Sequence, residues 1–439
     1  MLKRRLFIFS FIMIFISFSF SQEVSEKKEI AIFSLSYTDW SISDGALGLV
    51  DQSIQNVFVN LKRFDILGMS YRLQSQDINS FIQEIQKVKE SNLEVPEAVR
   101  LGEQTFTEAD FNKLVGSFII VIPVMSYYEV SSDDNGGYTA EIQTSFTFIN
   151  VAEGKAFANF QVDTTGSDET AKGAVKSAVD AMPIQLSYEV RKIPEFQIKT
   201  GILDVNGKEI LIELGANMGI KLGDEFNLTN TVILPSGHAV DKKVGLLVVK
   251  EVNQEVSTAQ VFYASKKPAI GDQLKEIPRM GFESAFYINY ISQTDINLDP
   301  ILAIGIRQIV ARGFYKTRPY VGVEIPLGAD MVGGFTNFFF FPVNVYVGTE
   351  LNWFLGRLHI TPAIDVALGM LVPIVEEYQD DYVIYSSIGG HVRLGASYMI
   401  TDNIKVFGEA GYSAMLSIND GFFNSYAGVL YGGGVTIKY

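Results

Sequence analysis

The last third of the chain alternates apolar and polar residues with a period of two. In the stretch FPVNVYVGTEL, for example, Val343, Val345 and Val347 share one face, while Asn344 and Tyr346 share the other. Such alternation predicts β-strands, and each segment reaches the about 9–11 residues that a tilted strand needs to cross a bilayer. Eight segments of this kind follow one another, at 281–292, 299–311, 316–327, 339–354, 357–370, 382–400, 403–416 and 425–439.

The connections between these segments alternate strictly between short and longer ones. The short ones span 312–315, 355–357 and 401–403, and the longer ones span 292–299, 327–338, 371–381 and 417–424. This alternation predicts an up-and-down barrel with its short turns in the periplasm and its longer loops outside the cell. A soluble β domain is the alternative, because the strands of a sandwich alternate too.

The chain ends on Tyr439, inside the last predicted strand. A barrel in lipid leaves no strand edge unpaired, so the last strand has to pair with the first. The ending GVTIKY resembles the C-terminal signal of outer-membrane barrels, which implies recognition of Tyr439 by the barrel-assembly machinery. In strand count and turn pattern the region resembles the small OmpA/OmpX type. We therefore expect residues 279–439 to form an eight-stranded antiparallel transmembrane β-barrel surrounded by outer-membrane lipid.

Aromatic residues stand at the ends of several predicted strands, on the outward face. Barrels in membranes carry such girdles at both interfaces, where amphipathic rings contact the headgroups. We predict this role for Phe341, Trp353, Tyr382, Tyr398 and Tyr439.

Charged residues occupy inward positions of the predicted barrel, five acidic and five basic. An eight-stranded barrel is only wide enough to be filled by side chains, and charges buried there need partners. We therefore predict a salt-bridged plug, with Arg393–Glu409 and Glu283–Lys438 as the leading pairs; a proton or ion path is the alternative. The ten residues are Glu283, Arg307, Arg318, Glu324, Glu350, Asp365, Arg393, Lys405, Glu409 and Lys438.

The N-terminus carries the features of a secretory signal. Three basic residues precede an apolar run, and Ser19-Phe20-Ser21 provides the small residues of a cleavage site before Gln22. We expect residues 1–21 to be removed; a retained membrane anchor is the alternative.

Residues 22–192 are expected to form an α/β domain. Apolar residues at helical spacing follow a Ser43 cap, a second amphipathic helix spans 78–88, and a long hairpin turns at Asp133–Gly136. A third strand leads to a helix with Ser167 as its cap. The stretches EIAIFSLSY, LKRFDILGMSY and FTFINVAEGKAFANFQVDTTGSDETAKGAVKSAV resemble the periplasmic domain shared by curli-pore lipoproteins, penicillin-binding-protein activators and the TolB N-terminal region. That resemblance implies protein binding and assembly.

Residues 193–278 are expected to form a small β-barrel domain of five or six short strands. A turn lies at Val205-Asn206-Gly207, and the pairs Gly223-Asp224 and Gly271-Asp272 punctuate the strands. The segment resembles the C-terminal β domain of flagellar assembly protein T, a family that also places this module after a TolB-like domain. The chain as a whole is therefore expected to be an α+β multidomain protein.

Composition excludes several functions. The net charge of -15, without a basic cluster, argues against nucleic-acid binding, and the absence of cysteine excludes disulfides, thiolate metal sites and cysteine nucleophiles. His391, Asp365 and Ser397 share the inward face and could serve a lipid-modifying enzyme, but polar filling explains them better. The acidic loop Glu376–Asp381 could hold Ca²⁺, although a solvated loop is the simpler interpretation. We expect no enzyme activity and no cofactor.

Together these features predict an outer-membrane protein with its N-terminal domains in the periplasm. The favoured function is that of an assembly or scaffold factor for an envelope or flagellar-type machine, with a periplasmic protein or a peptidoglycan-associated complex as its partner. A surface-interaction protein resembling an adhesin and a barrel enzyme acting on lipid are the alternatives.

Overall fold

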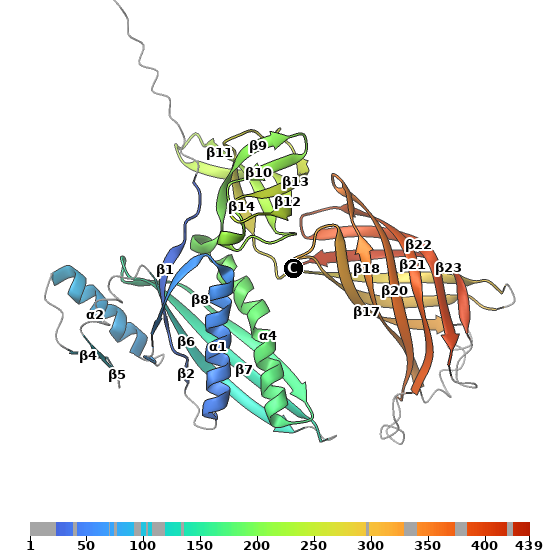
Figure 1. Cartoon of the computed structure of the whole chain (residues 1–439), viewed down its shortest axis with the longest axis horizontal. Coiled ribbons are helices and arrows are strands. Elements are labelled where there is room, and N and C mark those ends of the chain that lie inside the picture. The colour runs from blue at the N-terminus through green and yellow to red at the C-terminus, as the bar shows by residue number, and fades with distance from the viewer. Residues whose placement is uncertain are drawn as a thin grey trace, which may run out of the picture.

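The computed structural model contains an α/β unit, a closed six-stranded barrel and a closed eight-stranded barrel (Figure 1). The predicted signal segment, the turn at 133–135, Tyr382 and the acidic loop at 376–381 lie outside the residues that it describes. Those residues are 23–37, 42–69, 71–73, 77–91, 98–101, 104–107, 119–132, 136–295, 298–328, 340–373, 384–418 and 425–439.

The α/β unit is a sheet covered on both faces by helices. Its strand order is β3-β1-β6-β7-β8, with β1 parallel to both of its neighbours and β6, β7 and β8 antiparallel. Its elements are β1 (Lys28–Phe33), β2 (Ser36–Tyr37), α1 (Asp44–Leu61), β3 (Phe64–Met69), α2 (Ile78–Ser91), β6 (Ile119–Ser132), β7 (Tyr138–Asn150), β8 (Lys155–Asp168) and α4 (Ala171–Lys192). A separate pair, β4 (Ala98–Leu101) and β5 (Gln104–Thr107), completes the list.

The core of this unit follows the alternation of β1. Ile30 and Ile32 face the cluster that contains the buried residues of α1 and α4, whereas Ala31 and Phe33 face the cluster that contains Phe81 of α2. A run of apolar residues on a central strand thus supplies two cores, as expected for a strand that is buried on both faces.

Helix capping agrees with the sequence at α1 and differs at α4. The Ser43 side chain accepts a hydrogen bond from the Ala46 N–H, as predicted. The cap of α4 is Thr170, whose hydroxyl accepts from the Gly173 N–H at 3.0 Å, so the prediction of Ser167 is wrong. The reason is that β8 continues to Asp168, which keeps Ser167 in the strand, with its hydroxyl 3.2 Å from that of Thr139.

Gly166 lies in β8 where α4 crosses it. A Cβ at this position would lie 2.1 Å from the backbone nitrogen of Ala178. We expect Gly166→Val to destabilise the α/β unit by about 1–3 kcal/mol, because the added side chain must displace the backbone of α4. Pulse proteolysis in urea measures the loss. Gly68→Ala in β3, where a Cβ meets open space, is the matched control, and equal urea midpoints for the two variants would contradict the prediction.

The second unit is a closed barrel of six short strands. Its order is β10-β13-β12-β11-β14-β9, and its positive-φ glycines Gly223 and Gly271 form the predicted Gly-Asp turns. In each turn the aspartate accepts a backbone N–H, from Lys221 to Asp224 and from Ala269 to Asp272. The strands are β9 (Lys199–Asn206), β10 (Glu209–Ile212), β11 (Glu225–Ile233), β12 (Ala239–Val252), β13 (Ser257–Ala264) and β14 (Gln273–Ile277), after a short 3-10 turn η2 (Pro194–Phe196).

The third unit confirms the predicted eight-stranded antiparallel barrel. The last strand pairs with the first from Glu283–Lys438 to Gln293–Gly428, and β18 pairs with β20, so the sheet is closed. Its strands are β15 (Phe282–Gln293), β16 (Ile301–Val310), β17 (Thr317–Gly328), β18 (Phe340–Leu351), β20 (Leu358–Pro373), β21 (Ile384–Met399), β22 (Ile404–Ser417) and β23 (Tyr426–Lys438), with the short β19 (Trp353–Leu355) continuing β18.

Within the described part of the chain, no helix combines the length and apolarity required to cross a membrane.

Candidate functional site: buried charges inside and between the domains

Charged residues share the interior of the eight-stranded barrel with a buried apolar and aromatic cluster, and apolar residues cover the outside. All ten charged residues predicted to face inward are buried. Outward side chains on the same strands are largely exposed, among them Val347 (61%) and Val366 (60%). Ten buried charges beneath an exposed apolar wall reverse the usual arrangement of a water-soluble domain, which exposes its charges and buries its large apolar groups.

The middle of the barrel is organised around Asp365. Its carboxylate accepts hydrogen bonds from Arg393 Nη2 at 2.6 Å, Tyr320 Oη at 2.9 Å and the backbone N–H of His391 at 3.0 Å. His391 Nδ1 lies 2.7 Å from the same group, and its Nε2 lies 3.7 Å from Glu324. Hydrogen bonds from several sides compensate the burial of this carboxylate.

A second group of charges lies toward the end of the barrel with the short turns. Glu283 contacts both Lys405 at 2.5 Å and Arg318 at 3.0 Å. Arg318 also bonds Glu350. The charges therefore form a chain of shared partners.

The two leading pairs predicted from the sequence are wrong. Glu409 pairs with Arg307 at 2.7 Å, and Arg393 turns to Asp365. Lys438 is directly opposite Glu283 in the register, yet its ammonium group bonds Glu225 of the six-stranded barrel. Strand alternation determines which face a residue occupies. It does not determine the ion-pair partner, because long side chains can reach carboxylates on several strands.

The three residues considered for catalysis do not form a triad. His391 and Asp365 are in contact, but Ser397 is six residues further along β21. That spacing places the serine about 20 Å along the strand from His391, at about 3.3 Å per residue. Ser397 is instead opposite His359 in the register.

The cavity found among the charges near the short-turn end of this barrel is small. The cavity among Glu283, Arg307, Arg318 and Lys405 has a volume of about 30 Å³, room for about one or two water molecules. At the mouth with the short turns, Phe262 of the six-stranded barrel packs against Phe354, with 4.5 Å between ring centroids.

A barrel filled in this way should not conduct ions. We expect the purified protein in planar bilayers to show no steady conductance, because the charges are paired and Phe262 packs at the mouth against Phe354 and the inward His359. A stable, ohmic single-channel current at neutral pH would contradict the plug. The variant Phe262→Ala separates the two barriers, since a current in that variant alone would place the seal at the mouth.

Three of the predicted interface aromatics are exposed at the end of the barrel with the short turns. Trp353, Tyr398 and Tyr439 have exposed fractions of 55%, 51% and 42%. The side chain of Phe341 and the whole of Tyr382 lie outside the described residues.

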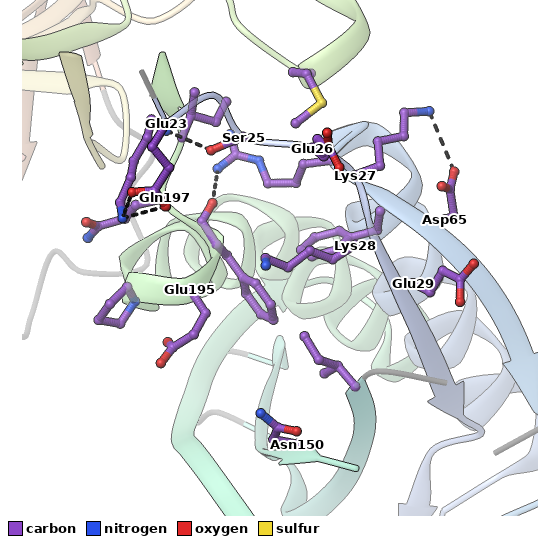
Figure 2. A pocket seen from close by; sticks show the side chains of 18 of the residues that line it. Glu23, Ser25, Glu26, Lys27, Lys28, Glu29, Asp65, Asn150, Glu195 and Gln197 are labelled. Atoms are coloured by element: carbon purple, nitrogen blue, oxygen red, sulfur yellow. Dashed lines mark hydrogen bonds and ion pairs between the residues drawn. The ribbon is translucent and has the colours of Figure 1, made fainter. Parts of the chain in front are cut away.

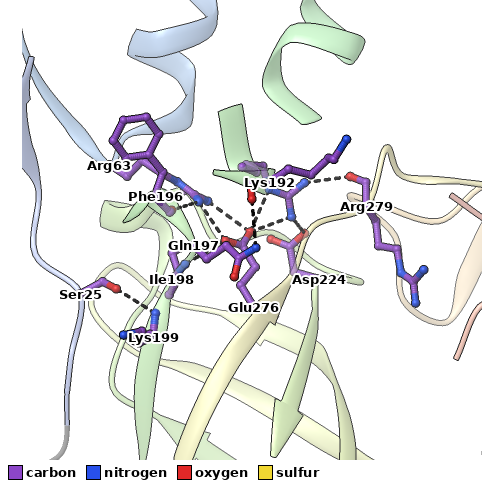
Figure 3. A network of polar contacts seen from close by, with 12 residues as sticks. Ser25, Arg63, Lys192, Phe196, Gln197, Ile198, Lys199, Asp224, Glu276 and Arg279 are labelled. Carbon is purple, nitrogen blue, oxygen red and sulfur yellow. Dashed lines mark hydrogen bonds and ion pairs between the residues drawn. The ribbon is translucent and has the colours of Figure 1, made fainter. Parts of the chain in front are cut away.

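A buried carboxylate joins the six-stranded barrel to the α/β unit (Figure 3). Glu276 of β14 bonds Arg63 Nη1 at 2.8 Å and Arg191 Nε at 2.8 Å, and it accepts the Ile198 N–H at 3.0 Å. Burial would raise the pKa of the Glu276 carboxyl, but the Arg63 and Arg191 guanidiniums hold this pKa well below its ordinary value. The site therefore favours a charged carboxylate.

Asp224 extends this joint to the eight-stranded barrel. Its Oδ1 lies 3.4 Å from Arg191 Nη2 of α4 and 2.7 Å from Arg312 Nε, in the turn between β16 and β17. One side chain of the six-stranded barrel thus contacts both other units.

The next residue, Glu225, holds the closing strand. It bonds Lys438 of β23 and Arg279, the latter at 2.9 Å. Arg279 also donates to Asn403 Oδ1 at 2.8 Å and to the carbonyl of Asp402 at 3.0 Å. Burial would raise the pKa of Glu225, yet Lys438 and Arg279 hold this pKa below its ordinary value.

All three short turns of the eight-stranded barrel contact the six-stranded barrel. Arg312 of the first turn binds Asp224, Arg357 of the second lies over the Tyr263 ring at 3.8 Å, and Asp402 of the third accepts a hydrogen bond from the Tyr263 hydroxyl at 2.5 Å. We call this set of contacts, together with the Glu276 and Glu225 ion pairs, the charged joint. The charged joint was not predicted from the sequence. The sequence did mark the Gly223-Asp224 turn, but nothing distinguished it from the Gly271-Asp272 turn, which is exposed.

An open cleft lies beside the joint, between the α/β unit and the six-stranded barrel. It has a volume of about 950 Å³ and is lined by residues 23–29, 63–65 and 194–199, among others. Figure 2 shows carboxylates and lysines around it, including Glu26, Lys28 and Glu195. Among the described residues, no group of three His, Cys, Asp or Glu side chains could hold a metal ion.

Known proteins offer only distant likenesses. Neisserial surface protein A is 15% identical and covers 36% of this chain and 96% of its own, with a TM-score of 0.26. A PelC dodecamer protein from Paraburkholderia phytofirmans is 8% identical (37% of this chain, 91% of its own, TM-score 0.22), and lipoprotein GNA1162 from Neisseria meningitidis is 9% identical (36% and 98%, TM-score 0.22). No protein-family model and no curated protein matches the sequence. These likenesses do not assign the chain to a family.

Proposed function

We propose that the protein is an integral outer-membrane protein whose barrel anchors a periplasmic, protein-binding scaffold. In this proposal the scaffold has no enzymatic role and organises an envelope assembly, such as a peptidoglycan-associated or flagellar-type complex. The observation that carries the proposal is the inverted polarity of the eight-stranded barrel, together with the charged joint at one end of it.

The apolar outer wall supports the membrane placement. Its exposed Val, Ile, Leu and aromatic side chains come from every strand of the barrel, whereas a soluble protein rarely exposes a continuous apolar surface of that extent. Closure of the sheet also satisfies the requirement that no backbone group faces lipid unpaired. Trp353, Tyr398 and Tyr439 then stand at the periplasmic interface.

The joint supports the placement of the other two units. They attach at the end with the short turns, which in outer-membrane barrels faces the periplasm. The filled barrel leaves no passage for folded domains. The α/β unit and the six-stranded barrel are therefore assigned to the periplasm.

The cleft beside the joint supports a binding role for the periplasmic body. Its volume of about 950 Å³ and its mixed charge suit a polar partner such as an extended segment of another protein. Because Arg63, which pairs with Glu276 in the charged joint, lines the cleft, a partner bound there would lie next to the contact that fixes the two units to each other.

The membrane placement is tested by alkaline extraction of cell envelopes and by gel migration with and without boiling. We expect the protein to stay with the membranes and to change its migration on heating. Protease treatment of intact cells should leave residues 23–278 uncut, and cleavage there would contradict the periplasmic assignment.

The scaffold role is tested by cross-linking from the cleft in living cells. A photo-cross-linker at Glu195 should capture an envelope protein, whereas the same group at exposed Lys208, on the six-stranded barrel outside the cleft, should not. Capture at neither position would count against the scaffold.

A further inference from the structure

A notch opens at the rim of the eight-stranded barrel, where its first short turn meets the six-stranded barrel. It has a volume of about 390 Å³, within the range of about 300–1,000 Å³ typical of small-molecule sites. Residues 313–317 form one wall, and Leu222, Lys250 and Glu251 form the other.

The walls of the notch are held in place by the charged joint. The Gly313 N–H donates to the Leu222 carbonyl at 2.8 Å, and Arg312 binds Asp224. A Cβ on Gly223 would lie 2.4 Å from the Ala311 carbonyl, which shows how closely the two backbones approach. The notch is therefore preformed.

The outer wall of the barrel becomes polar directly beside this notch. Gln308 of β16 and Thr317 of β17 are exposed at outward positions, and Thr317 also lines the notch. On strands further around the barrel, the outward residues at the same end are apolar or aromatic, including Trp353, Tyr398 and Ile404. The outward surface at this end of β16 and β17 is therefore more polar than on the other strands, with Gln308 accepting a hydrogen bond from Ser284 Oγ at 2.6 Å.

The notch contains both acidic and basic side chains, and they differ in how far they are already ion-paired. Lys250 is engaged by Glu209 at 2.5 Å and lies 3.7 Å from Glu251. Glu251 remains largely exposed, and Lys316 makes no ion pair within the described residues. Within the described residues the Lys316 ammonium group is thus unpaired, and the Glu251 carboxylate, 66% exposed, is held only by the 3.7 Å contact with Lys250.

We infer that this notch binds the headgroup of a zwitterionic phospholipid of the inner leaflet, one that carries a phosphate and a primary ammonium group. Lys316 binds the phosphate, and Glu251 binds the ammonium group. The acyl chains lie along the outward side chains Ile304, Ile306 and Val321. The inference rests on the proposed function, because only a barrel embedded in a bilayer presents the notch to lipid headgroups.

The test uses the full-length protein, reconstituted in vesicles of phosphatidylethanolamine and phosphatidylglycerol and then transferred to mild detergent. Native mass spectrometry counts the retained phospholipid. We expect one phosphatidylethanolamine on the wild type, and Lys316→Gln to lower its retention about tenfold, as for one lost charge-assisted hydrogen bond. Lys208→Gln, on the six-stranded barrel and outside the notch, is the control and should retain the lipid.

Glu251→Gln distinguishes the two headgroups. We expect it to remove the preference for phosphatidylethanolamine over phosphatidylglycerol, because only the former carries an ammonium group for Glu251. Free phosphorylethanolamine should not displace the lipid. Displacement would mean that the notch recognises the soluble headgroup alone, which would contradict a lipid site.

Equal retention by the wild type and Lys316→Gln would overturn the inference. Flotation of the same vesicles separates that result from failure of the membrane proposal. If all variants float with the vesicles after alkaline washing, only the headgroup site fails; if the wild type does not float, the proposed function fails as well.

Discussion

Replacing Glu276 by alanine is expected to destabilise the contact between the α/β unit and the six-stranded barrel by about 3–5 kcal/mol. The variant removes the carboxylate that both Arg63 and Arg191 contact at 2.8 Å. Arg191 keeps the Asp224 carboxylate at 3.4 Å and the Arg279 carbonyl at 2.9 Å, whereas among the described residues the Arg63 guanidinium keeps the Phe196 carbonyl at 2.9 Å. The buried Arg63 guanidinium, left without a carboxylate, accounts for most of the cost.

Hydrogen exchange resolved to peptides is the appropriate measurement, since a three-unit chain does not unfold in one step. We expect faster exchange at the end of α4 and in β14, while the eight-stranded barrel stays protected. Glu255→Ala, which removes an exposed carboxylate of the six-stranded barrel, is the matched control. Unchanged exchange in Glu276→Ala would show that the joint does not hold the two units together.

The pH dependence of this effect follows from the sign of the pKa shift. The folded-state pKa of Glu276 is lowered relative to the unfolded value of about 4.3. Its contribution to stability is therefore complete above that unfolded value and is lost as the pH falls through the folded-state pKa. We expect the difference between the wild type and Glu276→Ala to be constant from pH 8 to about pH 5 and to shrink in stronger acid.

The barrel could be predicted from the sequence because two independent patterns describe it. The period of two gives the faces, and the alternation of connection lengths gives the topology. The strand observed at Ile404–Ser417, for instance, begins one residue from its predicted start. Both patterns can be read from residues close together in the sequence. They predict the fold well where the whole outer face of the sheet contacts a single kind of environment.

The ion pairs could not be predicted in the same way. Arg393 has inward carboxylates on both neighbouring strands, at Asp365 and Glu409, and the backbone register does not decide between them. In the joint, Arg63 and Glu276 are 213 residues apart in the sequence. No periodicity connects residues on two different domains, so these contacts emerge only when the units are docked.

This distinction affects what each class of residue does. The residues that alternate determine where the barrel resides, since any apolar outward residue and any paired inward charge would serve. The residues of the charged joint determine how the α/β unit and the six-stranded barrel are oriented relative to the eight-stranded barrel. In the proposed scaffold, that orientation would carry the function, and it depends on charges such as Asp224 that contact two units at once.

The second large effect is expected inside the eight-stranded barrel, at Glu409. Its carboxylate binds Arg307 at 2.7 Å and Asn289 at 2.8 Å. We expect Glu409→Leu to destabilise the barrel by about 3–5 kcal/mol, because it leaves the Arg307 guanidinium buried without its carboxylate. Urea unfolding in micelles, followed by heat-modifiable migration on gels, measures the loss.

Adding Arg307→Met to this variant should restore most of the stability. A buried ion pair and a well-packed apolar pair of similar volume are often equivalent, since the desolvation of both charges offsets their attraction. The four proteins of the cycle then give the coupling energy directly. A double variant as unstable as Glu409→Leu would mean that Arg307 acts through its stacking on Tyr287 and Phe407, at 4.7 and 5.4 Å from their ring centroids, rather than through its charge.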